Sequence, residues 1–254
     1  MAATKSTTVV LITGCNRGIG KGLLTTYLSR PNHIVVGAVR NVDSLSSANL
    51  VLLPKGQDSR LILLKLDSES ISDASDLVEA LKSTHQINHL DIVIANAGIS
   101  NYFGKARITP AEEMLSHYTV NTMAPLLLFQ ATAPLLDHGS NPKFVAISSG
   151  AGSISGMDKL KVENTAYGAS KCALNFVIRK IHMENEGIIA FPINPGWLRT
   201  DLGNHAATGA GMEQAPVSVE DGIKGVIDQI DRATRESTSG RFMSAQDGNT
   251  ALPW

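Results

Sequence analysis

The chain has 254 residues, a formal net charge of −1 and an apolar content of 43%, which suits one large α/β domain. A nearly neutral chain without a basic stretch argues against nucleic acid as the main partner. Cys15 and Cys172 lack the spacing of a disulfide framework or metal site, and the seven histidines are scattered. We therefore expect free thiols and no bound metal.

No apolar run reaches the roughly 20 residues needed to cross a bilayer. A first strand that begins by Thr7 or Thr8 leaves no room for a signal peptide. The expectation from these two features is a cytoplasmic protein with no membrane partner.

Six short apolar runs, rich in β-branched residues, predict strands buried on both faces. They lie at 7–13, 33–39, 60–66, 90–96, 143–149 and 187–193. Longer segments with helical spacing lie between or beside them, at 18–30, 69–83, 109–136 and 164–186. Pro125 should kink or locally break the third of these helices. The alternation predicts right-handed βαβ units in one Rossmann-type domain over 1–254, with a doubly wound parallel sheet of about seven strands.

The segment 203–222 is rich in small residues and weakly patterned. It is either an ordinary surface loop or a mobile lid. Because it follows the last strong motif of the chain, we expect a substrate lid at about 203–218.

Gly14, Gly18 and Gly20 lie between the first predicted strand and the first predicted helix. A pyrophosphate can approach such a turn where Cβ atoms are missing, and the helix N-terminus supplies free N–H groups and positive potential. The spacing G-x-x-x-G-x-G is neither the G-x-G-x-x-G fingerprint nor a P-loop. A glycine cluster alone is also typical of a flexible turn, but its place after the first strand favours nucleotide binding.

Tyr167 and Lys171 are four residues apart on a predicted helix, so they share one face. Such a pair is common on surfaces, but it permits a specific chemistry. A nearby ammonium lowers the pKa of a phenol, which is otherwise near 10. The tyrosine can then exchange a proton with a carbonyl oxygen, and Ser148 or Ser149, at a strand end, can hold that oxygen.

These motifs, in this order, resemble those of the short-chain dehydrogenase/reductase family. They are TGCNRGIG (13–20), NAG (96–98), VNT (120–122), ISSGAG (147–152), YGASK (167–171) and NPGWLRT (194–200). Together they span nearly the whole chain and are highly specific, although none is specific alone. The stretches ITGCNRGIG, NTAYGASK and NPGW, with the ending LPW, most resemble fungal ketoreductases of the norsolorinic acid ketoreductase type.

The resemblance implies an active tetrad of Asn121, Ser149, Tyr167 and Lys171. Tyr167 is the expected general acid or base, and Ser149 the expected anchor of the carbonyl oxygen. Lys171 is expected to lower the tyrosine pKa and to bind the nicotinamide ribose. Asn121 is expected to hold a water in the proton relay.

The choice of Ser149 over Ser148 rests on position, because the family places its catalytic serine second in the pair. The gap from Ser149 to Tyr167 is longer than is usual in the family, since 156–164 carries extra residues. Asn121 and both serines are also residue types that cap helices or complete turns.

The end of the second predicted strand bears on the choice of nucleotide. In dinucleotide folds an acid here binds a ribose 2′-hydroxyl, whereas an arginine suits a 2′-phosphate. The strand ends with Val39 and Arg40, and Asp43 falls further into the loop. Arg17 in the glycine turn can add a second positive charge. Either arginine alone could be a surface residue, but both together favour NADP(H) over NAD(H).

By resemblance, further residues should line the dinucleotide, from the glycine turn through the adenine and its ribose to the nicotinamide. They are Gly14, Asn16, Gly18, Ile19 and Gly20; Asp67 and Ser68; Asn96, Ala97 and Gly98; Pro195, Gly196, Leu198 and Thr200, besides Tyr167 and Lys171.

Seven residues near strand ends are candidates for a substrate pocket, although each could instead pack in the core. They are Tyr102, Phe103, Gly150, Met157, Trp197, Leu202 and His205. An apolar, partly aromatic cavity suits a hydrophobic ketone better than a charged sugar.

The expected function is an NADPH-dependent carbonyl reductase that converts a bulky aromatic or polyketide-like ketone to a secondary alcohol. One alternative is an NAD-linked secondary alcohol dehydrogenase. Another is a nucleotide-sensing regulator without turnover, against which the intact tetrad argues. By analogy with the family, we expect a homodimer or homotetramer formed through 109–136 and 164–186.

Overall fold

The computed structural model describes residues 7–159, 162–246, 248 and 250–254. Its centre is one parallel sheet with the strand order β3-β2-β1-β4-β5-β6-β7. The strands are β1 (Thr8–Thr13), β2 (His33–Val39), β3 (Arg60–Lys65), β4 (Ile92–Ala95), β5 (Lys143–Ile147), β6 (Ile189–Asn194) and β7 (Met243–Ser244). The chain turns back between β1 and β4, which creates the crevice where open α/β sheets bind ligands.

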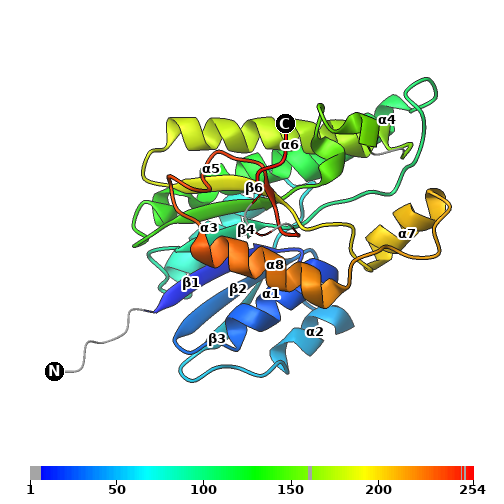
Figure 1. Ribbon diagram of the computed structural model, residues 1–254. Coiled ribbons are helices and arrows are strands. Elements are labelled where there is room, and N and C mark those ends of the chain that lie inside the picture. The colour runs from blue at the N-terminus through cyan, green and yellow to red at the C-terminus, as the bar shows by residue number, and fades with distance from the viewer. Residues whose placement is uncertain (1–6, 160–161, 247, 249) are drawn as a thin grey trace.

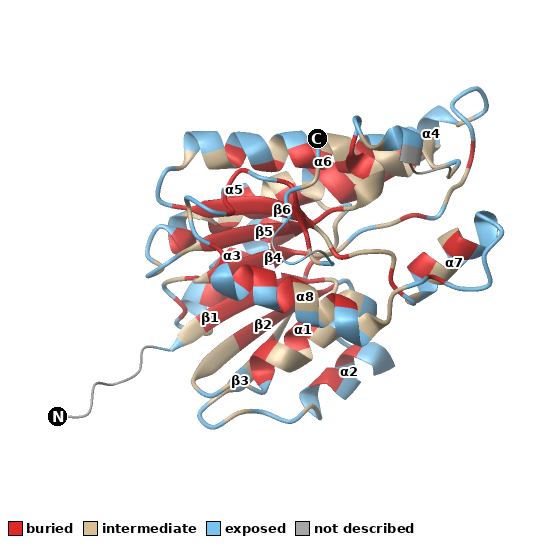
Figure 2. Ribbon diagram, viewed as in Figure 1, coloured by how far each residue is buried: buried red, intermediate tan, exposed pale blue. Residues whose placement is uncertain are grey.

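Helices cover both faces of the sheet, as Figure 1 shows. On one face lie α1 (Gly18–Leu28), α2 (Leu45–Val51) and α8 (Val219–Arg232). On the other lie α3 (Asp73–Ser83), α5 (Ala124–Leu136) and α6 (Thr165–Glu184). The strands between the two layers are buried almost throughout (Figure 2). Because side chains alternate along a strand, Val9 and Leu11 join one core and Val10 and Ile12 the other.

The segment predicted as one helix over 109–136 is broken near Pro125, as expected. It forms α4 (Ala111–Tyr118), a π-helical turn over Thr119–Met123, and then α5. Proline has no N–H to donate to the carbonyl four residues earlier, which belongs to Asn121, so the α-helical ladder cannot continue there.

The structure differs from the expectation for 203–222, since much of this segment is helical. Helix α7 (Asp201–Gly209) is capped at its N-terminus by Thr200, whose hydroxyl oxygen accepts a 3.1 Å hydrogen bond from the Gly203 N–H. Four of the nine residues of α7 are glycine or alanine and only Leu202 is a large apolar residue, so the sequence shows no apolar periodicity that indicates a helix. Figure 1 shows α7 standing apart from the two helical layers, beside the open end of the sheet. The predictions also missed α2, α8 and the two-residue strand β7.

Within the described residues, no helix is both long and apolar enough to span a membrane. The same part of the chain holds no group of three or more His, Cys, Asp or Glu residues that could bind a metal ion.

Candidate active site

A large cavity of about 1040 Å³ opens at the carboxyl ends of the central strands. Its walls include residues at or just after the ends of five strands: Gly14, Val39, Asn96, Ile147 and Asn194. Every residue that the sequence assigned to a dinucleotide lines this cavity, from the glycine turn to Thr200. The topology therefore brings together motifs that lie up to about 180 residues apart in the chain.

The glycine turn has the tight geometry expected from its sequence. Gly14 and Gly18 adopt φ values of +63° and +54°, which favour glycine. A Cβ on Gly14 would lie 2.9 Å from Cα of Ala97, so the turn packs directly against the NAG motif. Among the described residues, no side chain caps the start of α1, and its first turn holds no acid. The first N–H groups of α1 thus remain available to an anion in the cavity.

Tyr167, Lys171 and Ser149 meet on one wall of the cavity. The Lys171 amine lies 5.8 Å from the Tyr167 ring centroid and donates a 2.8 Å hydrogen bond to the Ile147 carbonyl. Burial lowers the pKa of Lys171 to about 8. Burial raises the pKa of Tyr167, and a hydrogen bond from Ser149 partly offsets this rise.

The two serines of the ISSGAG motif have different surroundings. The Ser148 hydroxyl is buried and donates a 2.6 Å hydrogen bond to Oδ1 of Asn175. The Ser149 hydroxyl oxygen accepts a 3.2 Å hydrogen bond from the Ala151 N–H, and Ser149 lies close enough to Tyr167 to lower the pKa of the phenol. Of the two serines, Ser149 is the one that lowers the pKa of Tyr167, and the choice of Ser149 over Ser148 stays a prediction.

Asn121 is fully buried in the π-helical turn and does not line the cavity. Its Oδ1 accepts a 2.8 Å bond from the Ile99 N–H, and its Nδ2 donates to the Ile99 carbonyl and to Ser170 Oγ. A Cβ on Gly98 would lie 3.0 Å from Asn121 Oδ1 and 3.5 Å from Lys171 Nζ. The Asn121 side-chain amide therefore fixes the backbone at Gly98 and Ile99, which passes beside Lys171.

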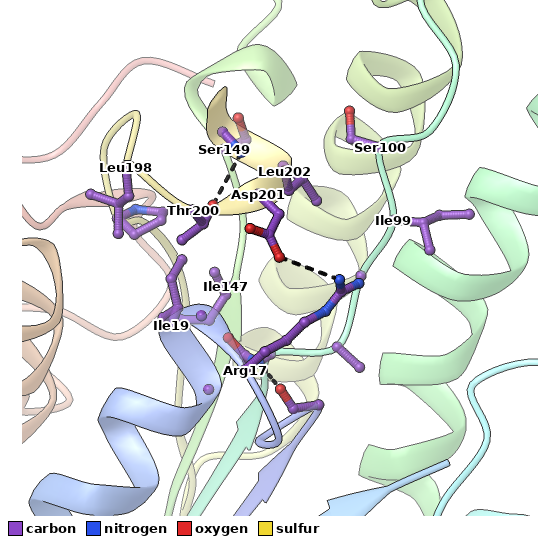
Figure 3. A pocket seen from close by; sticks show the side chains of 18 of the residues that line it. Arg17, Ile19, Ile99, Ser100, Ile147, Ser149, Leu198, Thr200, Asp201 and Leu202 are labelled. Atoms are coloured by element: carbon purple, nitrogen blue, oxygen red, sulfur yellow. Dashed lines mark hydrogen bonds and ion pairs between the residues drawn. The ribbon is translucent and has the colours of Figure 1, made fainter. Parts of the chain in front are cut away.

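Three arginines line the cavity, and the guanidinium of one of them, Arg199, donates hydrogen bonds to the Ala215 and Pro216 carbonyls. The other two, Arg17 and Arg40, are both exposed. Arg17 also reaches across the opening to α7, where its Nη1 lies 3.7 Å from the Asp201 carboxylate (Figure 3). Asp43, the acid that could have favoured a ribose hydroxyl, does not line the cavity.

The predicted substrate residues are only partly brought together. Phe103, Gly150, Trp197 and Leu202 line the cavity, whereas Tyr102, Met157 and His205 do not. The Tyr102 hydroxyl donates to the Ile108 carbonyl, and Met157 is exposed in a short 3₁₀ turn over Met157–Lys159. His205 is exposed on α7 and meets the edge of the Phe103 ring, with centroids 5.3 Å apart.

Sequence reasoning missed several residues of the inner wall, notably Ile99, Ser100, Val162, Asn164 and Ala206. Ile99 and Ser100 directly follow the NAG motif, so their position after a strand end was the available signal. Leu160 and Lys161, in the insertion before Tyr167, lie outside the described residues.

Cys15 packs in the hydrophobic core and does not line the cavity. It is fully buried in the core beneath α1, and burial raises the pKa of its thiol to about 12. A Cβ on Gly37 would lie 2.8 Å from its sulfur, so the two residues fill one space between helix and sheet.

The strand order, the glycine turn and the cavity at the strand ends define the class of Rossmann-fold α/β proteins. Within that class the chain belongs to the short chain dehydrogenase family, whose sequence profile matches residues 8–211.

Two fungal relatives match nearly the whole chain. Norsolorinic acid ketoreductase from Aspergillus parasiticus is 43% identical over 249 residues, which cover 97% of this chain and 91% of that protein. A norsolorinic acid ketoreductase from Dothistroma septosporum is 40% identical over 97% of this chain and 92% of its own length. The solved structure of an NADPH-bound carbonyl reductase from chicken fatty liver aligns with a TM-score of 0.85 and 26% identity, over 98% of this chain and 100% of that one.

Proposed function

We propose that this protein is an NADPH-dependent ketoreductase that converts a bulky hydrophobic ketone to a secondary alcohol. The observation that carries the proposal is the cluster of Ser149, Tyr167 and Lys171 beside a cavity large enough for a dinucleotide and a substrate. The fungal ketoreductases and the NADPH-bound carbonyl reductase that resemble the chain support it.

The residues present suit NADP(H). The uncapped start of α1 and the close approach at Gly14 provide a cradle for a pyrophosphate. Arg40 supplies positive charge where the second strand ends, and Arg17 adds a second charge from the glycine turn, as suits a 2′-phosphate. When bound, the cofactor supplies the hydride, and the chain must hold the ketone and deliver a proton.

In this proposal Tyr167 is the general acid. Because burial keeps its pKa high, the phenol holds its proton at neutral pH and can donate it to the carbonyl oxygen. The Ser149 hydroxyl holds the same oxygen and aligns it with the phenol. The Lys171 ammonium, 5.8 Å from the ring centroid, stabilises the phenolate that remains.

Asn121 supports this arrangement from a buried position outside the cavity. Its side chain bonds Ile99 and Ser170 and so fixes the NAG segment next to Lys171. Because its amide group already makes these bonds, we assign the side chain a positioning role, and the water of the proton relay stays a prediction.

The cavity walls support a hydrophobic substrate. Phe103, Trp197 and Leu202 contribute apolar surface on the side of α7 and of the loop after β4. A polyketide-like aromatic ketone is the substrate class we propose, in line with the names of the fungal relatives. We further propose that 203–218, with most of α7, is a lid that closes over this substrate.

A cofactor-oxidation assay tests the function. Purified protein is mixed with NADPH or NADH and a panel of aromatic ketones, bulky aliphatic ketones and a keto sugar. We expect NADPH oxidation with the aromatic ketones and little with the sugar. Preference for NADH would favour a NAD-linked alcohol dehydrogenase. NADPH binding without turnover of any ketone, or of the matching alcohols with NADP⁺, would favour a nucleotide-sensing regulator.

A further inference from the structure

A buried asparagine joins the serine turn to the helix that carries Tyr167 and Lys171. Asn175 lies one turn after Lys171 on α6, and only 2% of its surface is exposed. Its Oδ1 accepts the 2.6 Å hydrogen bond from Ser148, and its Nδ2 donates a 3.2 Å bond to the Gly152 carbonyl. One side chain therefore ties both ends of the turn that contains Ser149 to α6.

The turn is also packed tightly against the same helix. A Cβ on Gly152 would lie 2.7 Å from the carbonyl carbon of Lys171, so glycine permits the close approach. The Lys171 amine bonds the carbonyl of Ile147, just before the serines. Within the turn, the Gly152 N–H donates a 2.9 Å bond to the Ser149 carbonyl. The spacing between the serine and α6 is thus set by contacts at both ends of the turn.

We propose that Asn175 is a positioning residue that sets the distance and angle between the Ser149 hydroxyl and the Tyr167 phenol. Its catalytic consequence rests on the proposed ketoreductase function. Asn175 touches neither group directly, but it orients the turn on which the serine lies. Reacting groups must be held closely, because a displacement of about 1 Å can cost roughly 100-fold in rate. Loss of one partner also leaves a buried polar group without a hydrogen bond.

Two variants probe this link from opposite sides, and a third serves as a matched control. Asn175→Leu removes both hydrogen bonds by changing the residue on α6. Ser148→Ala removes one of them by changing the residue just after β5, with less risk to folding. Thr132→Val removes a buried hydroxyl on α5 that donates a 2.7 Å bond to the Leu128 carbonyl, far from the turn in the chain. All three lose buried hydrogen bonding, but only the first two loosen the serine turn.

We expect kcat for ketone reduction to fall roughly 10- to 100-fold in Asn175→Leu and less in Ser148→Ala. The NADPH dissociation constant should stay within about twofold of wild type in both, and Thr132→Val should keep its kcat. Unchanged kcat in Asn175→Leu and Ser148→Ala would overturn the proposal. An equal loss of kcat in Thr132→Val would overturn it as well.

Hydrogen–deuterium exchange gives a readout that does not depend on ketone reduction. We expect amides of 148–153 to exchange faster in Asn175→Leu and Ser148→Ala than in wild type. In Thr132→Val their exchange rates should equal those of wild type. If the wild-type protein reduces no ketone, the proposed function fails, and the exchange data alone decide whether Asn175 holds the turn. Identical exchange of 148–153 in all four proteins would overturn the structural part of the inference.

Discussion

At the scale of single residues, three arginines and one lysine line the cavity, and the account gives roles to Arg17, Arg40 and Lys171. Arg17 in the glycine turn and Arg40 after β2 are exposed, whereas Lys171 is buried and bonded to the Ile147 carbonyl. An exposed arginine side chain can change conformation to bind a phosphate group. A buried amine has a fixed position, and burial shifts its pKa. The two kinds of cation therefore call for different tests.

Arg40→Asp tests the proposed 2′-phosphate contact. Removal of a charge-assisted hydrogen bond, with a new negative charge, should weaken NADPH binding by roughly 10- to 100-fold. NADH affinity should stay within about twofold, and fluorescence titration measures both constants. The matched control is Arg60→Asp, which makes the same charge change at the exposed start of β3, the opposite end of the sheet. Equal weakening of both cofactors in Arg40→Asp would contradict a 2′-phosphate contact.

Lys171→Met tests the burial of the lysine amine in the free protein. The pKa of Lys171 is lowered from 10.5 to about 8, so between these pH values the unfolded chain binds more protons than the folded one. The contribution of Lys171 to the unfolding free energy therefore rises with pH in this window. From pH 8 to 10, wild type should gain about 2 kcal/mol relative to the variant. Urea denaturation at each pH measures this difference, and a constant difference would show that the amine titrates normally.

At the scale of elements, an ion pair links α7, which belongs to the proposed lid, to the glycine turn. Asp201, in the first turn of α7, pairs with Arg17, and the ring of His205 on the same helix contacts the ring of Phe103. The ion pair is largely exposed, so its contribution is small and sensitive to salt. The Asp201 carboxylate nevertheless competes for the Arg17 guanidinium, which the proposed 2′-phosphate contact also uses.

Asp201→Asn should therefore release Arg17 and tighten NADPH binding by roughly two- to fivefold, with less effect on NADH. In an Arg17→Ala background the same substitution should have no such effect. Glu213→Gln makes the same charge change at an exposed position after α7 and serves as the control. The coupling would be disproved by equal tightening with and without Arg17, as measured by titration at low salt.

Three features that the sequence predicted well have strong local patterns, although α8 was missed despite its buried face of Val226, Ile227 and Ile230. The glycine turn, the break near Pro125 and the tyrosine–lysine face of α6 all follow from residues close together in the chain. Helix α7 was expected as a loop because small residues give no apolar stripe. The two-residue strand β7 is too short to show an alternating pattern.

At the scale of the whole molecule, the strand order explains why distant motifs form one site. The sequence located each motif but not the contacts among them, because these depend on packing between α6, β5 and the turn after it. Asn175 illustrates this limit, since its bonds to Ser148 and Gly152 span 27 and 23 residues. Tyr102, Met157 and His205 illustrate the converse: they follow the right strands, but their side chains lie outside the cavity.

The central claim is that Tyr167 donates the proton during reduction of a ketone bound in this cavity. The most direct measurement compares kcat of wild type and Tyr167→Phe with NADPH and the best ketone of the panel, alongside the NADPH dissociation constant of each. Loss of a general acid should lower kcat by at least about 100-fold, while NADPH binding stays within about twofold. A Tyr167→Phe enzyme that reduces the ketone at nearly the wild-type rate would contradict the account.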